Sequence, residues 1–168
     1  MRKASLCLSL LLFLVVHVCA AESQAALAFQ RIKSLAGEWE GKDDSGSLAK
    51  TKFEVVVAGT AVLETLSMSG MEDMLTVYSV DGDGVALIHY CPTNNQPRMR
   101  ALPGPGDLMR MELNFIFRDA GNMPVPTTGH QQKLDLHVDD ENHITELWTW
   151  RQNGHDSVQT IHFTRKGK

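Results

Sequence analysis

The chain has 168 residues, 43% of them hydrophobic and 21% charged, which is the composition of a globular protein. Its 16 basic and 20 acidic residues give a formal net charge of −4, and no cluster of Lys and Arg follows the first three residues. This balance argues against nucleic acid and against anionic membrane surfaces as partners, because both require strongly basic patches.

The first twenty residues have the layout of a secretory signal peptide. Arg2 and Lys3 precede an apolar stretch over residues 6–18, and Ala20 and Ala21 form a zone of small residues suited to cleavage. The apolar stretch is shorter than the roughly 20 residues that a membrane-spanning helix needs. We therefore predict an exported protein, periplasmic or extracellular, with no integral membrane segment after the signal is removed.

Cys19 leaves a second interpretation of this leader open, that of the lipidated cysteine of a bacterial lipoprotein. The residues before it, Val16-His17-Val18, are not the small ones that the lipid-modifying machinery prefers. Cleavage after Ala20 leaves residues 21–168, which we predict to form a single domain large enough to bury a core. Cys91 is then the only cysteine, so an intramolecular disulfide is impossible and the fold must be stabilised by packing.

After the leader, the sequence predicts one helix followed by a row of short strands. Leu27, Ile32 and Leu35 form an apolar stripe that predicts a helix over residues 25–35, and Gly37 ends it. Beyond this point, short β-prone runs alternate with turn signals. We predict strands over residues 52–57, 61–66, 74–80, 85–91, 98–102, 108–117, 134–138, 144–150 and 158–164.

The order and number of these strands indicate a fold class. Asp81-Gly82-Asp83-Gly84 and Asn153-Gly154 are explicit hairpin turns, so neighbouring strands are antiparallel. A meander of about nine or ten short strands removes its edges most simply by closing on itself. We therefore predict an all-β fold, an antiparallel up-and-down β-barrel preceded by one short N-terminal helix. Trp39, between two glycines, is suited to plug the bottom of the barrel.

Two stretches carry a resemblance to known families. The helix leading into Gly-Glu-Trp-Glu-Gly at residues 37–41, followed only by meander strands, resembles the calycin-type barrels: lipocalins, fatty-acid-binding proteins and nitrobindin-like proteins. The segment from His89-Tyr90-Cys91-Pro92 to Arg98-Met99-Arg100 is similar to secreted bacterial lipocalin-like proteins whose function is not established. The chain lacks the disulfide pair and the later Thr-Asp-Tyr-type signature of true lipocalins. The resemblance implies a ligand cavity but no particular activity.

Polar residues on otherwise apolar strand faces are the candidate site. Glu64 shares a face with Val62 and Leu66, and His89 shares one with Leu87, while Arg98 and Arg100 lie on one face of their strand. If these faces point inward, the interior holds Glu64, His89 and an arginine. They would anchor the polar head of an apolar ligand, with a carboxylate bound by Arg98 or Arg100. The alternative is an internal network that only satisfies buried charges.

Tryptophan and histidine residues provide further candidates. Glu146, Trp148 and Trp150 share a strand face, where the two indoles would stack on a flat ligand or pack in the core. Nitrobindin-like barrels hold haem through a late histidine, which would be His155 or His162 here, but their other hallmarks are missing. No compact histidine spacing predicts a metal. We therefore expect neither a cofactor nor a metal site.

The sequence thus predicts a secreted β-barrel that binds a small apolar or amphipathic molecule without a covalent bond, as a carrier or sensor. Two alternatives stay open. In the first, Glu64 and His89 form a buried acid–base pair in a barrel enzyme of isomerase or cyclase type. In the second, the barrel is structural and its interior is filled. Neither the ligand nor the oligomeric state follows from the sequence.

Overall fold

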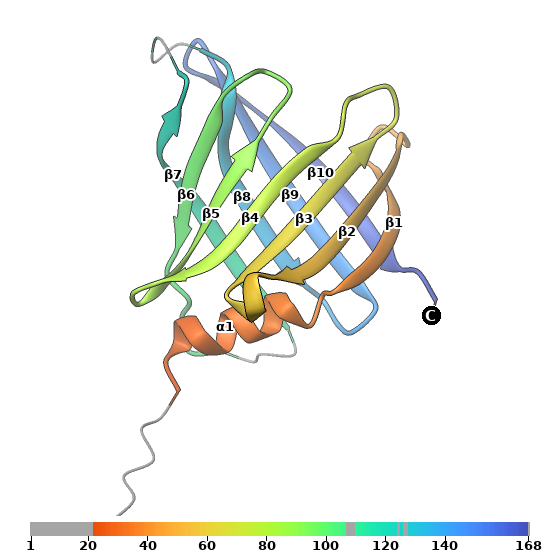
Figure 1. Cartoon of the computed structure of the whole chain (residues 1–168). Helices are drawn as coiled ribbons and strands as arrows, with labels where there is room; N and C mark the ends of the chain where they lie inside the picture. Colours follow the sequence, from red (N-terminus) through yellow and green to blue (C-terminus); the bar gives the residue numbers. More distant parts are fainter. Residues whose placement is uncertain (1–21, 107–109, 124, 126–127, 168) are drawn as a thin grey trace, which may run out of the picture.

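The computed structural model describes residues 22–106, 110–123, 125 and 128–167, and in this part the chain forms a closed barrel of ten antiparallel strands. Each strand pairs with its neighbours in sequence, and β10 pairs with β1 (Figure 1). This confirms the predicted up-and-down barrel. The strands are β1 Gly37–Asp43, β2 Leu48–Val56, β3 Ala61–Met68, β4 Met74–Asp81, β5 Gly84–Tyr90, β6 Gln96–Ala101, β7 Met111–Gly121, β8 His130–Val138, β9 His143–Gln152 and β10 His155–Arg165.

One α-helix, α1 (Gln24–Lys33), precedes the strands and lies across one end of the barrel (Figure 1). The Ser23 side chain caps it by accepting a hydrogen bond from the Ala26 amide. The predicted leader, with Cys19, lies outside the described residues. None of the helices in the described part is long and apolar enough to cross a membrane.

Trp39 closes the same end of the barrel, as predicted, from a strand that was not predicted. It lies in β1 and is 1% exposed, and its indole Nε1 donates a hydrogen bond of 2.9 Å to the Leu35 carbonyl. The Arg165 guanidinium lies 4.1 Å from the indole ring centroid and donates to the carbonyls of Ser34 and Ala36. The tryptophan and arginine therefore join α1, β1 and the end of β10.

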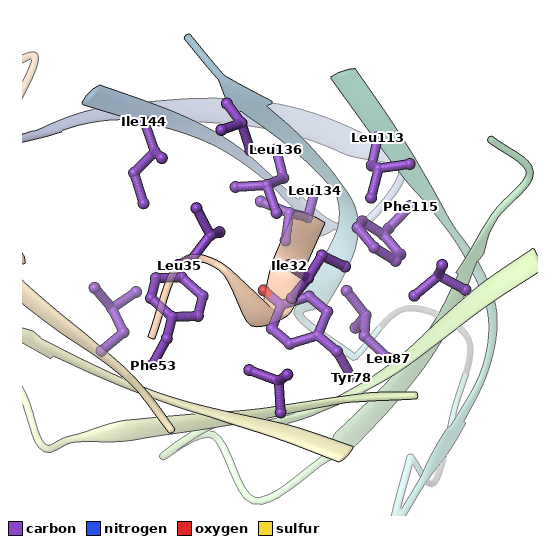
Figure 2. Close-up of a cluster of buried hydrophobic side chains, with 14 of the residues drawn as sticks. Ile32, Leu35, Phe53, Tyr78, Leu87, Leu113, Phe115, Leu134, Leu136 and Ile144 are labelled. Atoms are coloured by element: carbon purple, nitrogen blue, oxygen red, sulfur yellow. The ribbon is translucent and has the colours of Figure 1, made fainter. Parts of the chain in front are cut away.

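Apolar side chains fill the barrel next to α1. Along β3, β4 and β5, alternate residues point inward and are buried, as the pleat of a β-strand requires. Ile32 and Leu35 project among them from the helical end (Figure 2). Each such side chain stabilises the fold by about 1.5–3 kcal/mol through burial. The strand residues that surround them in Figure 2 are Phe53, Tyr78, Leu87, Leu113, Phe115, Leu134, Leu136 and Ile144.

The predicted hairpin turns are confirmed by the backbone. Asn153 and Gly154 connect β9 to β10 with φ values of 51° and 78°, the pair of left-handed residues that a two-residue hairpin turn of type I′ requires. Gly82, between β4 and β5, has φ 60°. Turn chemistry therefore fixes the register of these strand pairs locally. We call the end of the barrel away from α1 the distal end; the β9–β10 turn lies there (Figure 1).

Closure of the barrel depends on Gly41. A Cβ at this position would lie 1.8 Å from the carbonyl oxygen of His162, where β1 pairs with β10. We expect Gly41→Ala to lower the free energy of unfolding by about 3 kcal/mol or more, because the backbone of β10 cannot move aside without opening the barrel. Urea denaturation measures this loss.

Gly104→Ala is the matched control, since a Cβ at Gly104 meets open space. Its free energy of unfolding should stay within about 0.5 kcal/mol of the unmodified protein. Equal effects of the two substitutions would show that the close approach of β1 and β10 does not govern closure.

Candidate functional site

Among the buried side chains of the described residues, seven polar or partly polar ones on five strands are at most 3% exposed. They come from β2, β3, β4, β5 and β9, so the closed barrel brings them together from distant parts of the sequence. Fully buried glutamates are rare unless they are paired, so two of them in one interior require an explanation. We call these residues the interior polar cluster: Thr51, Glu64, Thr76, Tyr78, His89, Glu146 and Trp148.

Glu64 points inward from β3, on the face that it shares with Val62 and Leu66, and is 0% exposed. Its two carboxylate oxygens each accept a hydroxyl hydrogen bond, Oε1 from Thr51 at 2.9 Å and Oε2 from Tyr78 at 2.7 Å. Burial and the charge of Glu64 raise the pKa of Tyr78 well above its usual value, so this phenol stays protonated and donates. Both oxygens as acceptors are the arrangement of an ionised carboxylate.

Glu146 points inward from β9 and is also 0% exposed. The Trp148 indole Nε1 donates to its Oε2 at 2.9 Å. Burial raises the pKa of Glu146 well above its usual value, and the charge of Glu64 and a hydrogen bond with it raise the pKa further. Both effects favour the protonated form of Glu146. Its Oε1 is buried and has no hydrogen-bond partner among the described residues.

Glu64 and Glu146 are two fully buried carboxyl groups, and the charge of Glu64 acts to keep Glu146 protonated; we call this pair the carboxyl dyad. Two carboxyl groups held together in a water-poor interior cannot both ionise, and one of them keeps its proton. The Thr51 and Tyr78 hydroxyls stabilise the negative charge of Glu64.

His89 points inward from β5 and is 1% exposed. Burial lowers the pKa of His89 to about 4, so the imidazole is neutral at physiological pH. Its Nδ1 lies 3.0 Å from Thr76 Oγ1, and its ring packs on Trp148 with 4.7 Å between the ring centroids. The Nε2 atom is buried and has no hydrogen-bond partner among the described residues. Such an atom costs about 1–3 kcal/mol unless another molecule meets it.

Asn95 is a further buried polar residue at the distal end, and sequence reasoning missed it. Its Nδ2 donates to the Gly129 carbonyl at 2.7 Å, which joins the β5–β6 connection to the residue before β8. Its Oδ1 is buried and has no partner among the described residues. Asn95 lies in a connection, where no alternation of apolar and polar residues signals that a side chain points inward.

The predicted placement of Arg98 and Arg100 inside the barrel is wrong. They share a strand face as predicted, but that face is the outer one, where Arg98 pairs with Asp119 and Arg100 pairs with Asp81 at 2.8 Å. Met99 and its alternate neighbours point inward instead, because burying them gains apolar area while the guanidiniums keep both water and carboxylate partners. Neither arginine can anchor a ligand in the interior.

The structure separates the other predicted site residues. Trp148 belongs to the interior polar cluster, whereas Trp150 is half-buried and its ring lies against Gly129, where an added Cβ would come within 2.3 Å of it. Glu64 and His89 both pair in register with Thr76, and no hydrogen bond between their side chains is found among the described residues. The partner of Glu64 is Glu146 instead.

The two late histidines considered for haem are both exposed. His155 begins β10, and the Nδ1 of His162 lies 3.2 Å from Thr145 Oγ1 on the outer surface. Neither is a buried ligand to haem, so we assign no cofactor to them. In the described part of the chain, no group of three or more His, Cys, Asp or Glu side chains is arranged to hold a metal ion.

Comparison with known proteins finds a solved structure with a similar fold but identifies no family. The crystal structure of Rv2717c from M. tuberculosis is similar, with a TM-score of 0.65 and 17% sequence identity over 85% of this chain and 99% of that one. A protein of unknown function of the DUF3598 family from Nostoc punctiforme PCC 73102 gives a TM-score of 0.41 and 13% identity, over 80% of this chain and 49% of that one. No family model matches the sequence, and no curated protein matches it.

The neutral state of His89 makes a prediction about stability in acid. Its pKa is about 4 in the folded protein and near 6.5 in the unfolded chain, so the unfolded chain binds the extra proton between these values. Relative to His89→Gln, the unmodified protein should lose about 1.4 kcal/mol per pH unit as the pH falls from 6.5 to 4. Urea denaturation across this range measures the difference. The exposed His155→Gln should keep the slope of the unmodified protein, and equal slopes for all three proteins would contradict a buried neutral His89.

The contribution of Glu146 to stability should depend on pH in the opposite direction. Its pKa is raised in the folded state, so its contribution to stability is fully present below the unfolded value and is lost as the pH rises. Glu146→Gln keeps the hydrogen bond from Trp148 but removes the titration. The variant should therefore gain stability relative to the unmodified protein between pH 5 and pH 8, as measured by urea denaturation. The exposed Glu54→Gln serves as control, and a constant difference for Glu146→Gln across this range would refute the raised pKa.

Proposed function

We propose that the protein is an exported, calycin-like barrel that carries or senses a small, largely apolar molecule, bound without a covalent bond next to the interior polar cluster. The observation that carries this proposal is His89 Nε2, a buried polar atom without a partner among the described residues. Native interiors leave few such atoms unmet, and a ligand group that hydrogen-bonds to Nε2 would remove the cost.

The surroundings of His89 suit such a ligand. The imidazole and the Trp148 indole form one flat, neutral surface, suited to a ring or a hydrocarbon chain. Met68 and Met74, both buried at the distal ends of β3 and β4, add flexible apolar surface that adapts to ligand shape. An apolar pocket with a few fixed polar groups is the usual composition of a small-molecule site.

The ligand would enter from the distal end. The opposite end is covered by α1, and Trp39, Ile32 and Leu35 are buried there with at most 1% exposure. An enzyme using Glu64 and His89 is the less supported alternative, because both carboxylate oxygens of Glu64 are engaged by the Thr51 and Tyr78 hydroxyls. These partners hold the carboxylate in place rather than exposing it to a substrate.

A neutral fluorescent probe, N-phenyl-1-naphthylamine, tests the proposal. We expect saturable binding of one probe per protein, with fluorescence enhancement. Met74→Trp fills the interior at the distal end and should weaken binding by at least about tenfold, or 1.4 kcal/mol. Leu75→Trp, one residue along and 39% exposed on the outer face, should leave the affinity unchanged.

Cooperative thermal unfolding of both variants would show that they fold, and Met68→Phe provides a second filling variant. If the probe does not saturate, or if Leu75→Trp weakens it as much as Met74→Trp does, the site is not inside the barrel. A native mass spectrum of the purified protein then distinguishes a filled barrel from one that already carries a molecule.

A further inference from the structure

The charges inside the barrel restrict the ligand more closely. We propose that the interior polar cluster selects a ligand with a protonated amine, or another cationic nitrogen next to an apolar body, and rejects carboxylates. This inference rests on the proposed function and names its ligand class. It reverses the expectation of an acidic ligand, which was based on Arg98 and Arg100.

Buried negative charge without a neighbouring cation is the first ground for this ligand class. The carboxyl dyad of Glu64 and Glu146 is fully buried, and both oxygens of Glu64 accept hydroxyl hydrogen bonds, the arrangement of an ionised carboxylate. Among the described residues, the buried set contains no Lys or Arg, and Arg98 and Arg100 point outward. His89 is neutral. The negative charge of the dyad therefore has hydroxyl and indole donors but no cation in the interior.

This buried charge would attract a cationic ligand and repel an anionic one. In a water-poor interior, charges interact more strongly than at the surface because the effective dielectric constant is low. A cationic group that enters the barrel completes an ion pair with the dyad, whereas a carboxylate would add a second negative charge beside the first. Like charges forced together in this way disfavour binding.

Two buried polar atoms without partners among the described residues also suit a ligand that donates hydrogen bonds. Asn95 Oδ1 is a buried acceptor without a partner, and its orientation is fixed because the amide nitrogen donates to Gly129. His89 Nε2 is a second unpartnered atom and accepts when Nδ1 donates to Thr76. An ammonium group carries three donors and no acceptor, so it matches such atoms. A carboxylate offers only acceptors and would leave Asn95 Oδ1 unmet.

Three ligands with the same apolar body separate charge from hydrophobicity. Decylamine, decan-1-ol and decanoate are each titrated at pH 7, below their aggregation limits, against protein loaded with N-phenyl-1-naphthylamine. We expect decylamine to displace the probe with a Kd at least about tenfold lower than that of decanoate, with decan-1-ol between them.

The variant Glu64→Gln/Glu146→Gln removes the charge of the dyad without a change of side-chain size. It should bind decylamine and decan-1-ol with equal affinity, so that the preference for the amine is lost. Glu54→Gln/Glu112→Gln removes two surface carboxylates, whose side chains are 44% and 61% exposed, and so matches the number of carboxyl groups removed. This control should keep the preference for the amine, because that preference does not arise from non-specific attraction to an acidic surface. If the dyad variant does not fold, Glu64→Gln and Glu146→Gln are compared singly. Each should reduce the ratio of the Kd for decanoate to the Kd for decylamine.

The outcomes separate the two proposals. Saturable binding in which decanoate matches or exceeds decylamine overturns the ligand class and leaves the carrier function standing. An amine preference that survives in the dyad variant, or disappears in the Glu54/Glu112 control, also overturns it. If neither the probe nor any of the three ligands binds, the proposed function fails and the ligand class fails with it.

Discussion

The burial of two carboxyl groups in one barrel is the constraint on which the rest of the interior depends. Taking a carboxylate out of water costs several kcal/mol unless donors replace the lost hydration. Here the Thr51 and Tyr78 hydroxyls hold Glu64, and the proton on Glu146 removes the second charge. The hydrogen bond from Trp148 to Glu146 fixes the indole, on which His89 packs. The position of His89 and its unpartnered Nε2 are therefore consequences of the dyad.

Closure of the barrel makes this arrangement possible and directs it toward one end. Trp39, Arg165 and α1 seal the end where β1 and β10 meet, and buried apolar side chains fill the adjacent volume. Low polarity around the dyad strengthens every electrostatic interaction within it and penalises every unmet polar atom. The same surroundings that keep Glu146 protonated and His89 neutral thus define the ligand that the distal part of the barrel would accept.

Much of the fold follows from the sequence, because turn signals and alternating residues are local. These patterns predict the meander order of the strands and place Glu64, His89 and Trp148 on strand faces shared with apolar residues. They miss β1, since Trp39 is its only buried residue and no alternation marks it. They misplace Arg98 and Arg100, because strand periodicity defines two faces but does not say which is inner. They also cannot pair Glu64 with Glu146: β3 and β9 lie far apart in sequence and meet only through the closed barrel.

The protonation of the dyad is open to direct measurement. Infrared spectroscopy in heavy water resolves the carbonyl stretch of a protonated carboxylic acid from the bands of ionised carboxylates. At neutral pD, the account predicts one such band, which is lost in Glu146→Gln and retained when the exposed Glu54 is replaced by Gln. A spectrum in which every carboxyl group is ionised at neutral pD would contradict the proton on Glu146, and with it the charge on which the selection of a cationic ligand depends.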